Sequence, residues 1–146
     1  MTPSNELRQT FAPLQDRGLI QMIDETPVVD LIERAFPFSG SKIDWDAVPG
    51  SQVKTRSSGS PVTECRTFLD ECLRHLDPSA PLLIVGDGIM DFAIAVRLGD
   101  LDCCFEEIIH LPQHTYITTP TAEWCLVVTM EDDLCFGHAP PLNKPL

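Results

Sequence analysis

The sequence predicts an α+β domain whose N-terminal helices pack on one face of a mostly antiparallel sheet. Two changes of pattern support this fold class. Residues 60–77 carry apolar side chains three and four positions apart, as in a helix, whereas residues 92–98 alternate between apolar and small or charged side chains, as in a strand. Helices come first and a β-β-α-β-β-β order follows, which is typical of this class. The length of 146 residues suits one domain, so we expect a single domain over 1–146.

Two helices are predicted before the first long loop. Residues 4–18 predict a short helix with Ser4 as its N-cap, and Pro13 interrupts its pattern. Residues 26–36 predict a second helix with Thr26 as its N-cap and a proline at the first helical position. This helix should end where the next proline follows, because the residue before a proline disfavours helical geometry.

The third predicted helix begins after Ser60, which can act as its N-cap, and ends at Asp77. Its apolar stripe consists of Val62, Cys65, Phe68, Leu69, Cys72, Leu73 and Leu76. A stripe of this width indicates a helix with one face in the core.

Residues 39–60 predict a long loop, since they are rich in glycine, serine and proline and hold three of the ten basic residues. Trp45 is the expected anchor of this loop. The tail over residues 139–146 should be loosely ordered.

The second half of the chain predicts the sheet. Short apolar or alternating runs indicate strands, and one segment returns to helical spacing between them. The expected strands are 81–87, 92–98, 114–119, 124–130 and 134–138, with a helix over 99–112. The last two strands are joined at residues 131–133, a length that suits a tight hairpin.

The charge is the most distinctive feature of the composition. Ten basic and 22 acidic residues give a net charge of −12, and residues 77–133 hold eleven acidic residues against one arginine. A field of this sign repels nucleic acid and anionic membranes, and it speeds encounter with basic proteins. Solubility alone is the alternative explanation, because acidic surfaces are common in cytosolic proteins.

The six cysteines are spread along the chain, mostly inside apolar patterns. No segment has the pattern of a signal peptide or of an apolar span of about 20 residues, so we expect a cytoplasmic protein with reduced, buried thiols. No Cys-x-x-Cys pair occurs, and Cys65 and Cys72 fit the apolar stripe of their helix. We therefore expect no metal site and no cofactor.

The sequence contains only weak matches to the residue patterns of catalytic sites. Cys135 and His138 are three residues apart, which places them on opposite faces of a strand. Residues 86–88 (Gly-Asp-Gly) lack the Lys-Ser/Thr pair of a phosphate loop. Glu106 and Glu107 are adjacent on a helix and cannot face one site together. An enzyme that uses a cysteine or histidine stays open as an alternative.

Three consecutive acids, Glu131, Asp132 and Asp133, occupy the predicted hairpin turn. Acids in a turn are ordinarily solvated, and their spacing does not fit a calcium loop. Nearby, His114 and Tyr116 predict a polar network that holds the turn between helix and strand, with contact to a partner as the competing role.

Residues 111–117 (LPQHTYI) and 123–137 (EWCLVVTMEDDLCFG) follow a helix rich in leucine and glutamate. They combine a Pro-x-His-x-Tyr entry, a Trp-Cys pair on a strand, and an acidic turn leading to Phe-Gly. Over roughly residues 81–138 this pattern resembles the C-terminal half of immunity proteins of bacterial polymorphic toxins, in particular those of contact-dependent growth inhibition systems.

The resemblance implies a small cytosolic protein without catalytic activity. It would bind and block the C-terminal toxin domain, commonly a nuclease, that a neighbouring cell delivers. An acidic inhibitor complements the basic cleft of a nuclease. An acidic adaptor or regulatory protein without a toxin partner has the same bulk properties and is the main alternative.

No contact residue carries over from the resemblance by motif, so the candidate partner-binding residues come from charge and turn position. They are Asp87, Asp91, Asp100, Asp102, Glu106, Glu107, Glu131, Asp132 and Asp133. Trp124 or Tyr116 would supply an aromatic anchor if exposed, although a core position for Trp124 is the simpler expectation.

Overall fold

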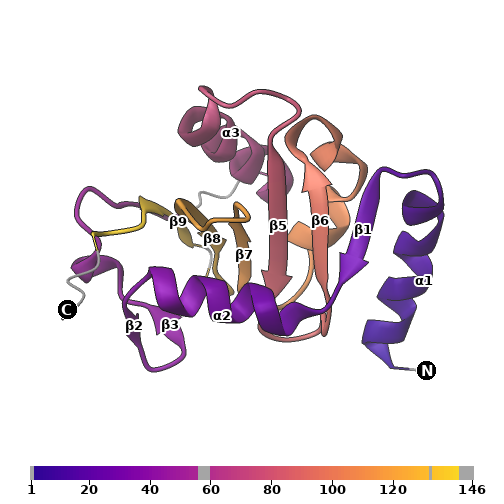
Figure 1. Cartoon of the computed structure of the whole chain (residues 1–146), viewed down its shortest axis with the longest axis horizontal. Coiled ribbons are helices and arrows are strands. Elements are labelled where there is room, and N and C mark those ends of the chain that lie inside the picture. Colours follow the sequence, from indigo (N-terminus) through magenta and orange to yellow (C-terminus); the bar gives the residue numbers. More distant parts are fainter. Residues whose placement is uncertain (1, 56–59, 132, 142–146) are drawn as a thin grey trace.

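The computed structural model describes residues 2–55, 60–131 and 133–141. Within these ranges the chain forms a seven-stranded antiparallel sheet of order β1-β6-β5-β7-β8-β9-β4 and a separate β2–β3 hairpin (Figure 1). The strands of the sheet are β1 (Ile20–Ile23), β4 (Gln52–Thr55), β5 (Pro81–Gly86), β6 (Ala93–Arg97), β7 (Thr115–Thr118), β8 (Trp124–Val128) and β9 (Asp133–His138). The hairpin consists of β2 (Phe38–Ser39) and β3 (Lys42–Ile43). The prediction of an α+β fold with an antiparallel sheet is confirmed.

The helices of the described residues vary widely in length, and none is long and apolar enough to cross a membrane. They are α1 (Pro3–Asp16), α2 (Glu25–Ala35), α3 (Pro61–Leu73), α4 (Phe105–Ile109) and the two 3-10 helices η1 (Trp45–Ala47) and η2 (Leu98–Cys103). Each predicted helix therefore has a counterpart, but the 99–112 segment is broken in two. Cys104 has φ −130° and ψ −5°, outside helical geometry, between η2 and α4.

Helices cover both faces of the sheet, not one face as the sequence predicted. α1, α3 and α4 pack into one hydrophobic cluster with the sheet, and α2 packs into a second cluster on the opposite face. The reason lies in the strands, which are apolar on both sides. In β8, Trp124 and Leu126 belong to the first cluster, whereas Cys125 and Val127 belong to the second. A strand that is buried on both faces needs cover on both.

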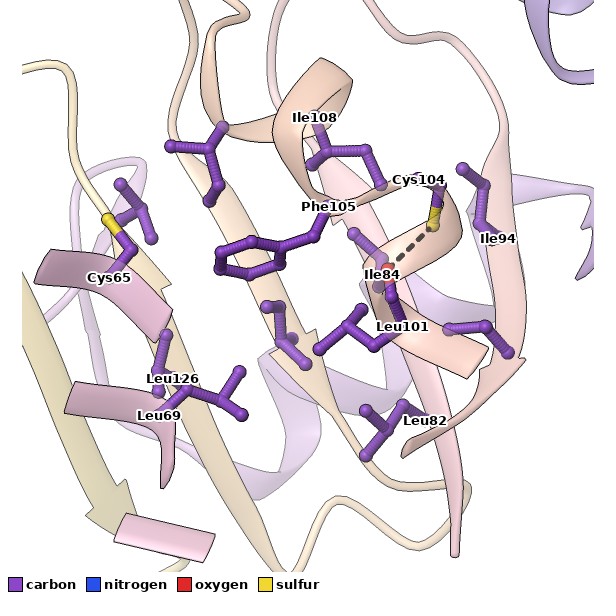
Figure 2. Close-up of a cluster of buried hydrophobic side chains, with 14 of the residues drawn as sticks. Cys65, Leu69, Leu82, Ile84, Ile94, Leu101, Cys104, Phe105, Ile108 and Leu126 are labelled. Carbon is purple, nitrogen blue, oxygen red and sulfur yellow. Dashed lines mark hydrogen bonds between the residues drawn. The ribbon is translucent and has the colours of Figure 1, made fainter. Parts of the chain in front are cut away.

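The α3 face holds the larger core. Figure 2 shows Phe105 of α4 between Cys65 of α3 and Ile84 of β5, and all three side chains are buried. The Cys104 thiol next to it donates a hydrogen bond to the Leu101 carbonyl, with an Sγ–O distance of 3.6 Å. Burial of a phenylalanine contributes about 1.5–3 kcal/mol to stability. The predicted apolar stripe of α3 is confirmed as the helix face in this core.

The N-caps follow local hydrogen-bond geometry. Ser60 caps α3 as predicted, because its hydroxyl accepts a hydrogen bond from the Thr63 N–H at 3.4 Å. The N-cap of α2 is Asp24 instead of Thr26. The Asp24 carboxylate accepts a hydrogen bond from the Thr26 N–H at 3.0 Å, and its negative charge interacts favourably with the positive end of the helix dipole.

The N-cap of α1 is Thr2, whose hydroxyl accepts from the Asn5 N–H at 3.2 Å. The predicted cap Ser4 is inside the helix, and its side chain reaches Asp91. Pro13 also lies inside α1 without ending it.

Residues 39–60 are not the structureless loop that the sequence predicted. They complete the β2–β3 hairpin and form η1 and the edge strand β4, which pairs with β9. Trp45 is the anchor, as predicted: its ring lies 6.1 Å from that of Phe36, and it packs against the second cluster. The sequence pattern did not indicate these short elements because they are polar. β4, for example, is exposed along its whole length and therefore has no apolar face. Residues 56–59 lie outside the described ranges.

The β8–β9 hairpin is confirmed. The Asp133 N–H donates to the Thr129 hydroxyl at 2.9 Å, and the Thr129 N–H donates to the Asp133 carbonyl at 3.0 Å. Asp132 and residues 142–146 of the predicted tail lie outside the described ranges.

Candidate functional site

A groove of about 470 Å³ opens on the α2 face, between α2, the β2–β3 hairpin and the segment that follows β5. Carboxylates line it from two parts of the chain. α2 contributes Glu25, Asp30 and Glu33, and the segment after β5 contributes Asp87 and Asp91. No lysine or arginine is found among the described residues that line this cavity. We call it the acidic groove.

One carboxylate of the acidic groove is neutralised by α1. Asp91 accepts a hydrogen bond from the Ser4 hydroxyl and forms an ion pair with Arg8, with an Nη2–Oδ1 distance of 2.8 Å. These hydrogen bonds, first that of Ser4 and then that of Arg8, hold the pKa of Asp91 below its usual value. Asp91 therefore fixes the N-terminal turn of α1 to the rim of the groove.

The remaining carboxylates are not balanced by a cation. In the described part of the chain, none of Glu25, Asp30, Glu33 and Asp87 forms an ion pair. The Asp87 carboxylate instead accepts a hydrogen bond from the backbone N–H of His114 at 2.9 Å, which fixes its position at the end of β5. The groove thus keeps an excess of negative charge.

The pKa of Glu25 reflects the negative potential of the groove in part. This pKa is raised, first because burial removes water from the carboxylate and then because Asp91 and Asp24 oppose a further negative charge. The charge of Arg8 acts in the opposite direction. A cation that entered the groove would relieve the same repulsion.

Tyr116 lies deep between α2 and the sheet. It stands on β7, paired with Val85 of β5 and Val127 of β8, and its side chain lines the acidic groove and a neighbouring cavity. The residue is 7% exposed, yet its hydroxyl has no hydrogen-bond partner within the described ranges. Burial and the charge of Asp87 raise the pKa of Tyr116, so this hydroxyl stays protonated and can both donate and accept.

The neighbouring cavity, of about 400 Å³, is lined by two described carboxylates, of which Glu131 is paired with a lysine. Lys42 pairs with Glu131 at an Nζ–Oε1 distance of 3.0 Å, and this bond holds the pKa of Glu131 below its usual value. His114 is 7% exposed; its Nδ1 accepts from the Met130 N–H at 3.1 Å, and its Nε2 lies 3.8 Å from Glu131. His114 therefore holds the β8–β9 turn through Met130. The predicted network of His114 with Tyr116 at the turn between helix and strand has no hydrogen bond between the two side chains in the described ranges.

The structure separates the predicted partner-binding residues. Of the predicted residues that the structure describes, only Asp87 and Asp91 lie in the acidic groove. Glu131 and Asp133 line the neighbouring cavity, where Asp133 accepts from the Thr55 hydroxyl at 3.1 Å.

The other predicted residues lie on η2 and α4, which belong to the α3 face. Asp100 pairs with Arg97 at 3.1 Å, and Asp102 pairs with Arg66 at 3.2 Å. Glu106 and Glu107 are exposed on α4. The predicted residues thus do not form one surface, because the sheet stands between the two groups.

Sequence reasoning missed the three carboxylates of α2. They flank the buried positions Val28 and Ile32, so by pattern alone α2 is an ordinary amphipathic helix. Only the pairing of β5 with β7, which brings the segment after β5 beneath α2, shows that these acids share a cavity with Asp87. The spacing of Glu25, Asp30 and Glu33 is a usable signal once that topology is known.

The thiols are poor nucleophiles. Burial raises the pKa of Cys72 and of Cys135 to about 11, and it raises the pKa of Cys104 and Cys125 as well. A protonated thiol neither attacks an electrophile nor binds a metal well. Across the described residues, no three His, Cys, Asp or Glu side chains are placed to hold a metal ion.

Trp124 is 3% exposed and packs on Phe136 in the α3-face core, with ring centroids 5.8 Å apart. It is a core residue, which leaves Tyr116 as the one of the two predicted aromatic anchors that lines the acidic groove. Neither a model of any protein family nor any curated protein matches this chain.

Proposed function

We propose that this chain is an immunity protein, a non-catalytic inhibitor that acts in the cytoplasm and binds the C-terminal domain of a cognate toxin through the acidic groove. The observation that carries the proposal is a set of four carboxylates around one concave surface, none of which forms an ion pair within the described residues. The earlier resemblance to immunity proteins of contact-dependent growth inhibition systems points in the same direction.

The toxin best suited to this groove is a nuclease. A nuclease needs a basic cleft for the phosphates of its substrate, and an acidic inhibitor complements that cleft and accelerates its own association. With a net charge of −12, this chain itself repels nucleic acid, so it does not compete for the substrate of the toxin.

We place the proposed binding surface on the α2 face and not over the whole acidic C-terminal half. The proposed binding residues keep Asp87 and now include Glu25, Asp30 and Glu33. They no longer include Asp100 and Asp102, which already form ion pairs. Charges that already have a partner contribute little to a new interface, since the existing ion pair must be broken first.

The test is co-purification with the protein encoded immediately upstream, expressed as its isolated C-terminal domain, together with a growth assay for its toxicity. We expect a complex that weakens as salt increases and that abolishes toxicity. The double variant Glu33→Gln/Asp87→Asn should slow association several-fold. The control Asp16→Asn/Glu71→Gln makes the same charge change at exposed positions of α1 and α3 and should associate at the wild-type rate.

Absence of a complex, with toxicity unchanged, would refute the toxin partner and favour an acidic adaptor. Equal slowing by both double variants would show that net charge, and not the acidic groove, determines association.

A further inference from the structure

The Tyr116 hydroxyl is the least explained polar group of the α2 face. The hydroxyl oxygen is not among the fully buried polar atoms that lack a partner, and such a group normally finds a protein, water or ligand partner. This hydroxyl lies on a residue that is 7% exposed, and no protein group within the described ranges hydrogen-bonds to it. It belongs to a side chain that lines the acidic groove, close enough to Asp87 for that charge to act on it.

We propose that the acidic groove is the receptor for one arginine side chain of the partner protein, whose guanidinium binds the Tyr116 hydroxyl and the Asp87 carboxylate. The identity of the partner as a toxin rests on the proposed function, but the receptor itself does not. Arginine is one of the residues enriched at interface hot spots, which cluster in desolvated pockets.

The arrangement of acceptors favours arginine over lysine. Carboxylates line the groove from α2 and from the segment after β5, and Tyr116 lines the same groove. A planar guanidinium has five N–H donors that point in fixed, divergent directions, so it can serve several acceptors at once. The ammonium of lysine has three donors at one point and is more strongly hydrated.

The apolar part of the lining suits the rest of the side chain. Val29 and Ile32 of α2, Phe38 of the hairpin and Met90 line the same groove. These surfaces can cover the three methylene groups of an arginine while its head reaches the acceptors. A metal ion is a poorer fit, because the carboxylates in the described ranges do not form a group that could hold one.

Binding of Nα-acetyl-arginine amide to the ¹⁵N-labelled full chain, followed by NMR, tests the receptor without any toxin. We expect saturable shifts at the amides of Val29, Gly86, Asp87 and Tyr116, with a dissociation constant in the millimolar range. Nα-acetyl-lysine amide should bind more weakly. Nα-acetyl-citrulline amide, which has nearly the same shape without the charge, should give no saturable shifts.

The variant Tyr116→Phe keeps the ring and removes only the hydroxyl. It should weaken the arginine probe about tenfold, as expected for loss of a hydrogen bond to a charged group, while lysine binding and the thermal midpoint stay near wild type. The control Asp16→Asn/Glu71→Gln should bind the arginine probe with wild-type affinity. Equal affinity for the three probes, shifts that spread to α3 and α4, or wild-type affinity in Tyr116→Phe would each overturn the receptor.

The two proposals fail differently. Specific binding of the arginine probe, together with no toxin complex, would support the receptor and refute the toxin partner. A toxin complex that forms with unchanged affinity in Tyr116→Phe would support the proposed function and overturn the receptor.

Discussion

The side-chain amide of Gln113 packs directly against the α carbon of Gly86, so that a Cβ at Gly86 would lie 2.1 Å from its Nε2. Gln113 is 3% exposed, and its amide connects two parts of the chain: Oε1 accepts from the Met90 N–H at 3.1 Å, and Nε2 donates to the Thr115 hydroxyl at 3.3 Å. This amide holds the segment between β5 and β6, and with it one wall of the acidic groove, against the start of β7.

Gly86→Ala should therefore destabilise the fold by about 1–3 kcal/mol, because the added methyl displaces a buried amide from its hydrogen bonds. Urea denaturation measures this cost. The structure further predicts that the cost largely disappears in a Gln113→Ala background, where the methyl has room. An equal cost in both backgrounds would show that Gly86 is required for another reason.

Leu69→Ala should cost about 2–5 kcal/mol, because it leaves a cavity in the core between α3, α4 and the sheet. Leu69 is 0% exposed. Val53→Ala is the matched control: Val53 is 58% exposed on the edge strand β4, and its truncation should change the free energy of unfolding by less than about 0.5 kcal/mol. A small effect at Leu69 would contradict the assignment of α3 to the core.

We predict that ionisation of buried cysteine thiols lowers the free energy of unfolding in alkaline solution. Burial raises the pKa of Cys135 from 9.0 to about 11, so the folded state keeps a proton that the unfolded state releases above pH 9. The resulting stability is fully present below pH 9 and is lost as the pH rises through about 11. Urea midpoints between pH 8 and pH 11 measure the decline. The Cys125→Ala/Cys135→Ala variant should show a flatter profile; an identical slope would remove these thiols as its cause.

The periodicity of apolar residues made most of the elements predictable, whereas two of the three N-caps and the long-range placement of the elements were not. The stripe of α3, the strand order after Pro81 and the β8–β9 turn depend on local patterns, and the structure confirms them. β4 escaped detection because its pairing with β9 bridges distant parts of the chain and leaves no apolar pattern. The acidic groove was not predicted for the same reason. Glu33 and Asp87 are remote in sequence, and only the topology of the sheet brings them into one cavity.

Arg8 and Asp91 should move the pKa of Glu25 in opposite directions. Arg8→Ala removes a positive charge that lowers the pKa of Glu25, so this pKa should rise further and make the groove still more unfavourable for negative charge. Asp91→Asn removes a negative charge that raises it, so the pKa of Glu25 should fall. NMR titration of the Glu25 side-chain carboxyl measures both shifts. Arg34→Ala is a control from the other end of α2, where Arg34 bonds the Asp30 carbonyl, and it should leave this pKa in place. Shifts of the same sign in Arg8→Ala and Asp91→Asn would mean that loss of the α1 contact, and not charge, controls Glu25, and the groove would then owe its potential to α1 packing.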